Sequence, residues 1–166
     1  KFATLRLLFG YQYTHPGKKL HFMGAEFAQW AEWSETRPLD WHLLQWPTHK
    51  GVQDWLRDLN HFYQSQPALW QHDFDPTGFQ WIEANDVEQS VFTYVRFADD
   101  PTDFLVIACN FTPVPRHQYR IGVPEMGHYS EMLNSDSEHY GGGNVGNNGG
   151  VDAEAIAWHI WQQSIS

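Results

Sequence analysis

The spacing of apolar residues along the chain changes twice. Residues 2–13 place apolar side chains at helical spacing, and His15-Pro16-Gly17 ends the predicted helix. The apolar run 19–23 then predicts a short buried strand, and residues 24–48 predict a long loop. A second helix is predicted over 49–66. Its apolar face consists of Val52, Trp55, Leu56, Leu59, Phe62 and Tyr63.

After Pro67 the helical spacing disappears, and short apolar runs separated by turns replace it. Three strands are predicted at 79–83, 91–97 and 104–110, and weaker ones at 119–123, 128–133 and 153–158. Thr112-Pro113-Val114-Pro115 predicts an extended loop, because proline cannot donate to a strand ladder. This pattern is typical of an antiparallel β-sandwich. We therefore predict a domain boundary near residue 66, dividing the chain into 1–66 and 67–166.

Composition narrows the class of ligand. The formal net charge of -10 argues against a nucleic-acid backbone or an anionic membrane as the main partner. Nine tryptophans and an aromatic share of 16% suit a neutral polyhydroxylated ligand, although an aromatic-rich core gives the same composition. The single cysteine, Cys109, excludes an internal disulfide and predicts a reducing, cytoplasmic compartment. No apolar run approaches the ~20 residues that cross a bilayer.

Carboxylates and tryptophans follow directly after the predicted strand at 19–23. In β/α proteins the carboxyl ends of strands collect ligand-facing groups. An indole face stacks on a sugar ring, and a carboxylate accepts its hydroxyl hydrogen bonds. Glu26, Trp30 and Trp33 are therefore candidate sugar contacts, and Trp81 is a candidate stacking residue outside the main cleft. The alternative is structural: the tryptophans anchor the loop by packing, and Glu26 bonds loop amides and holds the rim.

Other motifs lead to no site. The string 141–146 spells G-x-G-x-x-G, but Asn147-Asn148-Gly149-Gly150 cannot begin the helix that a dinucleotide site requires. The ten histidines include no His-Glu-x-x-His motif, so no metal site is predicted. A glycosidase pair is conceivable among the loop carboxylates Glu26, Glu32, Glu35 and Asp40. In β/α glycosidases, however, the catalytic acids come from different strands, so no catalytic residue is assigned.

Several strings together resemble the bacterial 1,4-alpha-glucan (glycogen) branching enzymes of the alpha-amylase superfamily. The resemblance covers nearly the whole chain, in order and with family-like spacing. The matching strings are Gly24-x-Glu26-Phe27-x-Gln29, in which Ala25 departs from the family's usual Gly or Asn, Glu32-Trp33, Leu39-Asp40-Trp41-His42-Leu43-Leu44, Gly51-Val52-Gln53, Arg57-Asp58-Leu59-Asn60, Asp73-Phe74-Asp75-Pro76, Gly78-Phe79, Asn110-Phe111-Thr112-Pro113-Val114-Pro115-Arg116, Tyr119-Arg120, Gly122-Val123-Pro124 and Leu133-Asn134-Ser135-Asp136.

The resemblance implies an α+β fragment: the last strand and helix of a (β/α)8 barrel, then an antiparallel all-β C-terminal domain. It implies a retaining transferase that cleaves an alpha-1,4 glucan and passes the freed segment to a 6-hydroxyl, with no metal or organic cofactor. The family's catalytic carboxylates lie upstream of Lys1, so the partners expected are an alpha-glucan and the N-terminal part of the same barrel. The stretch 158–164 departs from the family pattern, and the family's final strand is expected beyond Ser166.

Two rival hypotheses remain. The chain is either part of a branching enzyme or a non-catalytic glucan-binding β-sandwich module that uses Trp81, Trp30 and Trp33. A third reading, a hydrolase that uses Glu26 and Glu32, requires both acids to come from one loop. Residues 1–66 are also expected to expose apolar faces large enough to cause self-association.

Overall fold

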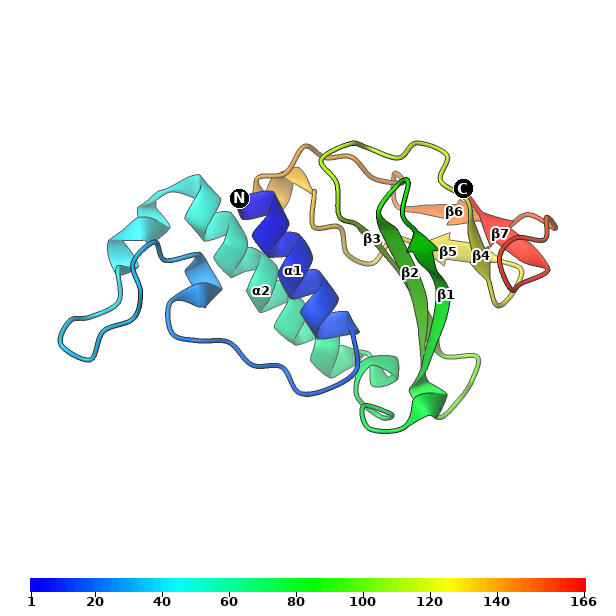
Figure 1. Cartoon of the computed structure of the whole chain (residues 1–166), viewed down its shortest axis with the longest axis horizontal. Coiled ribbons are helices and arrows are strands. Elements are labelled where there is room, and N and C mark those ends of the chain that lie inside the picture. Colours follow the sequence, from blue (N-terminus) through cyan, green and yellow to red (C-terminus); the bar gives the residue numbers. More distant parts are fainter.

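Two helices stand on one side of a three-stranded sheet, and two short strand pairs lie on its other side (Figure 1). The computed structural model describes residues 1–166. In chain order the helices and strands are α1 (Phe2–Thr14), α2 (Pro47–Ser65), β1 (Phe79–Asp86), β2 (Val91–Phe97), β3 (Phe104–Asn110), β4 (Ile121–Val123), β5 (His128–Ser130), β6 (Gly150–Asp152) and β7 (Gln163–Ile165). Short 3-10 helices occupy Ala25–Phe27, Trp41–Gln45, Pro67–Leu69, Pro76–Gly78 and Glu138–Tyr140.

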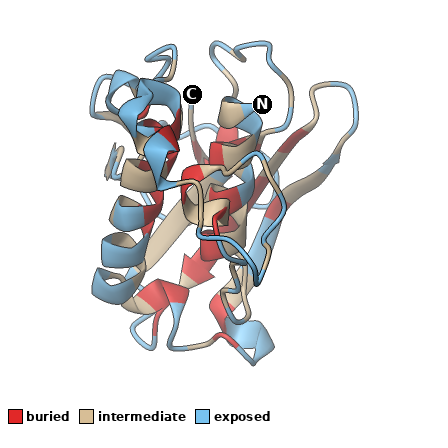
Figure 2. Ribbon diagram, turned by 90° about the vertical axis from the view of Figure 1, so that its left-hand side faces the viewer, coloured by how far each residue is buried: buried red, intermediate tan, exposed pale blue.

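The first core lies between α1 and α2. Its buried members are Phe9, Tyr13, Val52, Trp55, Leu56, Leu59 and Tyr140. Two side-chain bonds fix the alignment of the helices: Trp55 Nε1 donates to the Arg6 carbonyl at 2.8 Å, and Tyr13 Oη donates to Asn60 Oδ1 at 2.8 Å. The outer side of α2 is exposed while its inner side is buried, as its apolar spacing predicts (Figure 2).

The second core belongs to the sheet, in which β2 pairs antiparallel with β1 and β3. Tyr94 points toward α1, and its hydroxyl lies 2.6 Å from Thr14 Oγ1. Val95 points to the opposite face, where it packs with Ile82 and Ile121. The register shifts between Trp81 and Glu83, which is a β-bulge in β1. The strand β2 is thus the central strand of this sheet, and side chains on both of its faces are buried.

One buried guanidinium joins the helices to the sheet. Arg96, on β2, has no exposed surface and pairs with the nearly buried Asp73, with Nη2 3.1 Å from Oδ1. The same guanidinium donates to the carbonyls of Thr14 at 2.8 Å, Gly78 at 3.0 Å and Leu69 at 3.1 Å. A buried charge is tolerated only when its donors are satisfied, and this one is.

A polar loop over residues 131–147 also ties the β part to the helices. Tyr140 packs edge-on against the Trp55 ring, with centroids 4.9 Å apart, and its hydroxyl donates to Asp58 at 2.8 Å. A Cβ on Gly51 would lie 2.3 Å from the Tyr140 carbonyl oxygen, so only glycine fits there. Asp136 accepts the backbone N–H of Gly143 at 3.0 Å. The glycine-rich segment is thus a tight turn held by side chains, with no nucleotide-binding helix after it.

The structure confirms most of the predicted elements and corrects two. Both helices, β2 and β3 lie where the pattern predicts them. The predicted strand at 19–23 is wrong: the segment is irregular, with Leu20 81% and Phe22 66% exposed, because no other strand lies beside it to complete a ladder. The predicted strand at 153–158 is also wrong. Strand pairing is found instead at Gly150–Asp152, which pairs with β5, and at Gln163–Ile165, which pairs with β4. The residues between these two strands turn back as a hairpin.

None of the helices is both long enough and apolar enough to cross a membrane.

Candidate functional site

The loop after Gly24 is held by its own side chains. Gly24 adopts a left-handed conformation with φ 89°, and its N–H donates to the Glu26 carboxylate at 2.9 Å. Gln29 accepts the Asp40 N–H at 2.8 Å and donates to the Ala31 carbonyl at 2.8 Å, which closes the base of the loop. Glu26 therefore bonds a loop amide, and it retains acceptor capacity for a ligand.

Two candidate tryptophans project from this loop toward different neighbours. Trp30 is 63% exposed and stands edge-on to Phe2, with ring centroids 5.7 Å apart, and to His49 at 5.4 Å. Trp33 is 41% exposed and stands edge-on to Phe22 at 5.8 Å. Each ring is fixed at one edge while much of its surface stays in solvent. That is the geometry a stacking platform needs.

Trp81 is separate from the loop and lies on β1, on the other side of α1 (Figure 1). It is 38% exposed, and its ring is bordered by Phe79 at 5.0 Å, Tyr94 at 5.4 Å and Phe92 at 6.0 Å. The structure thus does not gather the four candidate residues into one site. It divides them between the loop, which carries three, and the sheet, which carries one.

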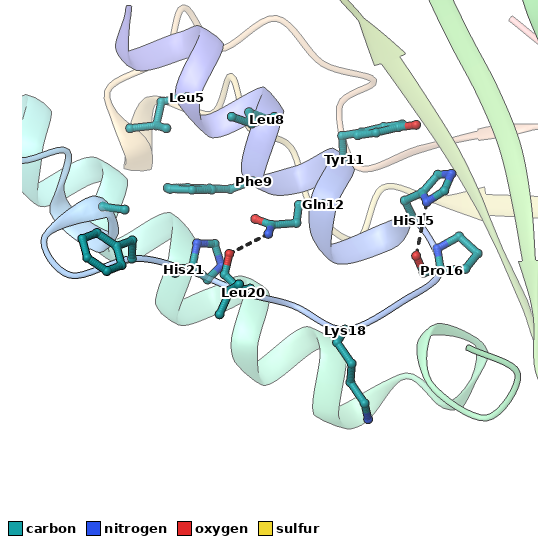
Figure 3. Close-up of a pocket in the computed structure, with 12 residues that line it drawn as sticks. Leu5, Leu8, Phe9, Tyr11, Gln12, His15, Pro16, Lys18, Leu20 and His21 are labelled. Atoms are coloured by element: carbon teal, nitrogen blue, oxygen red, sulfur yellow. Dashed lines mark hydrogen bonds between the residues drawn. The ribbon is translucent and has the colours of Figure 1, made fainter. Parts of the chain in front are cut away.

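A groove that sequence reasoning missed lies between α1 and the segment 15–25 (Figure 3). Its volume is about 560 Å³, and most of its lining residues are hydrophobic. The Gln12 side chain lies across the groove, and its Nε2 donates to the Leu20 carbonyl at 2.8 Å. His21 stacks on Tyr13 with centroids 5.5 Å apart, and its buried Nε2 has no hydrogen-bond partner. Burial lowers the pKa of His21, while the Glu26 carboxylate acts in the opposite direction.

The edge of this groove is an unpaired stretch of backbone. Residues 18–23 make no strand pairing. Their backbone forms one hydrogen bond with another backbone group, in which Ala25 N donates to the Phe22 carbonyl at 2.9 Å. On the opposite wall, Leu8 of α1 is 53% exposed. The signal for the groove was present in the sequence, because α1 carries apolar residues on all sides, as a helix covered from several directions does.

Comparison with known proteins identifies the β part. A family model described as alpha amylase, C-terminal all-beta domain, matches residues 81–166. The chain belongs to this family. The antiparallel all-β architecture predicted for the second part of the chain is thereby confirmed.

Relatives also cover the helical part. The chain is similar to proteins named 1,4-alpha-glucan branching enzyme from Hydrogenovibrio crunogenus, with 58% identity over 95% of this chain, and from Thermosynechococcus vestitus, with 53% identity over 99%. The Aquifex aeolicus relative is 48% identical over the full chain. The chain spans 22%, 22% and 26% of these three relatives, which is about a quarter of their length. The resemblance to branching enzymes is confirmed.

Proposed function

We propose that this chain is the C-terminal part of a 1,4-alpha-glucan branching enzyme, which cleaves an alpha-1,4 glucan and forms alpha-1,6 branches. The observation that carries the proposal is the similarity to branching enzymes over almost the whole length of the chain, across both the helices and the β domain. In this proposal residues 1–66 close a (β/α)8 barrel and residues 67–166 form the β-sandwich domain. The cytoplasm is the compartment that fits glycogen synthesis.

The helical part supports the barrel assignment. The order helix, extended segment, long loop, helix is that of a β/α repeat. The unpaired backbone at 18–23 supplies the donors and acceptors of a strand, and the apolar groove beside it is open along α1. Inside a complete barrel these backbone groups would be buried and would need partners, which neighbouring strands of the same polypeptide would supply, making this segment the last strand of the barrel.

No catalytic residue is assigned in this chain. A retaining transferase needs one carboxylate as nucleophile and a second as acid and then base, about 5–5.5 Å apart. Glu26 is held in its own loop by the Gly24 amide, which suits a residue that fixes the rim of the site. The two catalytic acids would come from the other three quarters of the enzyme. The chemistry needs no metal or organic cofactor.

Glucan contact is the role proposed for Glu26, Trp30, Trp33 and Trp81. Trp30 and Trp33 would border the cleft at the strand's carboxyl end, where Glu26 accepts sugar hydroxyl bonds. Trp81 would hold a glucan chain away from that cleft, because its ring lies on the sheet rather than on the loop. An exposed indole with fixed edges binds the C–H face of a pyranose without much ordering cost.

A chimera tests the proposal. The 166 residues would replace the corresponding segment of the Aquifex aeolicus relative, and branching of amylose would be followed by the loss of iodine staining. We expect the chimera to be active, because the segment would complete the barrel and carry the β domain. The isolated chain, as the matched control, is expected to be inactive. A folded chimera without branching, or an active isolated chain, contradicts the proposal.

The exposure of Trp81 favours a second candidate, a glucan-binding module that acts without catalysis. Titration of the isolated chain with maltoheptaose, followed by tryptophan fluorescence, tests for binding. Saturable binding together with an inactive chimera would favour the module. Saturable binding together with an active chimera would assign the same surface to the enzyme.

A further inference from the structure

A hairpin on the far side of the sheet from α1 exposes three large apolar side chains. This hairpin, residues 154–164, connects β6 to β7 and lies over β4 (Figure 1). Ile156 is 45% exposed, Trp158 is 47% exposed and Ile160 is 53% exposed. Nothing assigned so far uses these residues. Apolar side chains gathered at a hairpin tip expose surface that would favour a ligand.

The hairpin has a fixed conformation. Trp158 and Trp161 exchange two backbone hydrogen bonds of 3.1 Å each, and Glu154 and Ser164 exchange two more at 2.8 and 3.1 Å. Trp161 faces inward and packs against the cluster of Ile82, Val95 and Ile121. The outward side chains are therefore presented from a rigid support, which lowers the entropic cost of binding.

The tip of the hairpin rests directly on β4. A Cβ on Gly122 would lie 2.2 Å from the Trp158 carbonyl oxygen, so the approach requires glycine. His159 adopts a left-handed conformation with φ 52°, which is uncommon for a residue other than glycine. Its Nδ1 accepts the Gly122 N–H at 3.2 Å. The neutral imidazole then carries its proton on Nε2, which can donate to a ligand.

Acidic groups of β1 stand near this imidazole. Burial lowers the pKa of His159, and the carboxylates of Glu83 and Asp86 act in the opposite direction. Asp86 is occupied by the Tyr119 hydroxyl at 2.8 Å and the Gln89 N–H at 2.9 Å. Glu83 accepts only the Asn85 N–H, so one of its oxygens remains available. His159, whose ring centroid lies 5.9 Å from that of Trp158, thus supplies a free donor beside the indole, and Glu83 is an available acceptor that acts electrostatically on the same imidazole.

We propose that Trp158 and His159 form a second glucan-contact site, on the opposite face of the sheet from Trp81. The exposed indole provides the stacking face, His159 Nε2 donates to a sugar hydroxyl, and Glu83 accepts from one. A neutral sugar suits this acidic surface, where an anionic polymer would be repelled. The identification of the sugar as an alpha-glucan rests on the proposed function, whereas the position of the site rests on the hairpin.

Two sites on opposite faces have a consequence for long substrates. A glucan chain held at both Trp81 and Trp158 would have two points of attachment on one domain, which raises the effective concentration of the polymer near the enzyme. A short oligosaccharide would occupy each site independently. The two sites therefore predict independent binding of maltoheptaose.

The test is a maltoheptaose titration of the ¹⁵N-labelled chain, followed by the tryptophan indole N–H signals. We expect the Trp158 indole and the His159 ring signals to shift together, in the wild type and equally in Trp81→Ala. In Trp158→Ala, the dissociation constant for maltoheptaose read from the His159 signal should rise about tenfold. This is the loss expected when a stacking contact worth about 1.4 kcal/mol is removed. Trp158→Phe should recover part of the affinity. Trp70→Ala, which removes another exposed tryptophan, is the matched control and should change nothing.

The design separates this inference from the proposed function. A Trp158 signal that stays constant while Trp81 responds would overturn the hairpin site and leave the branching-enzyme proposal intact. The same constant signal is expected if the hairpin instead contacts a protein. A Trp158 response that disappears in Trp81→Ala would also overturn it, because the two sites would not be independent. Amide spectra of the variants establish that each one folds.

Discussion

The helical part and the sheet part of this molecule complete their cores to different degrees. In the sheet, β2 is covered on both faces, and its buried arginine has all its partners within the chain. In the helical part, α1 is buried where it faces α2 and where Thr14 meets Tyr94 of the sheet. Leu8, Leu20 and Phe22 on the other side are between 53% and 81% exposed. The difference indicates that the contacts of the sheet, including those with α1, are completed within this chain, whereas the helices are built to contact more polypeptide.

The largest effect is expected from breaking the buried pair in the sheet. Arg96→Met removes the charge that neutralises Asp73 and leaves three carbonyls without donors, so we expect a loss of about 3–5 kcal/mol of unfolding free energy. Urea denaturation followed by circular dichroism measures it. Arg37→Met removes an exposed arginine of the loop and should stay within about 0.5 kcal/mol. Equal losses in the two variants would show that the contacts of Arg96 do not complete the core around β2.

A smaller effect is expected where the β part contacts α2. Gly51→Ala places a methyl group against the Tyr140 carbonyl. The backbone must shift to relieve this overlap, so we expect the unfolding free energy to fall by about 1–3 kcal/mol. Gln64→Ala, on the exposed side of the same helix, should be nearly neutral. Thermal unfolding of both variants gives the difference. A stable Gly51→Ala variant would show that the 131–147 loop is not held tightly against the helix.

The exposed apolar side of the helical part should control association more than stability. Leu20→Ser combined with Phe22→Ser removes two exposed apolar side chains, so the unfolding free energy should change by less than about 0.5 kcal/mol. Self-association of the chain, measured by light scattering against concentration, should decrease. Val87→Ser, at another exposed apolar position, is the control and should leave association unchanged. A monomeric wild-type chain would contradict the interpretation of this surface.

The smallest effects concern two histidines with opposite shifts. Burial lowers the pKa of His21, so its contribution to stability is complete above the unfolded value of 6.5 and is lost as the pH falls from 6.5 through the folded value. Hydrogen bonding to Asp75 raises the pKa of His72, so its contribution is present below 6.5 and is lost as the pH rises through the folded value. NMR titration of the ring protons should give midpoints on either side of 6.5.

Sequence patterns predicted the elements whose burial is decided locally. The second helix has one apolar stripe, and the strands at 91–97 and 104–110 are mostly apolar runs bounded by turns, so each was placed correctly. The segment 19–23 has the composition of a strand, but pairing depends on neighbours that composition does not supply. The hairpin at 154–164 escaped prediction because its turn uses His159 in a left-handed conformation, which is unusual for histidine.

The candidate sites could be predicted only as residue types. Tryptophans and carboxylates suggested a sugar, but their grouping depends on contacts between distant parts of the chain. Trp81 meets Tyr94 across a strand pair and lies far from the loop of Trp30. Arg96 gave no signal, because a single arginine in a mostly apolar strand predicts a side chain that faces solvent. Its partners lie 18 to 82 positions away along the chain.

The guanidinium of Arg96 contacts the end of α1, two short turns and β2, so these four segments share a single point of attachment. No one of them can open without exposing the same charge. Amide protons in all four should therefore exchange with solvent at a common rate, set by one cooperative event. The helices and the sheet, although they differ in how complete they are, would then unfold as one unit.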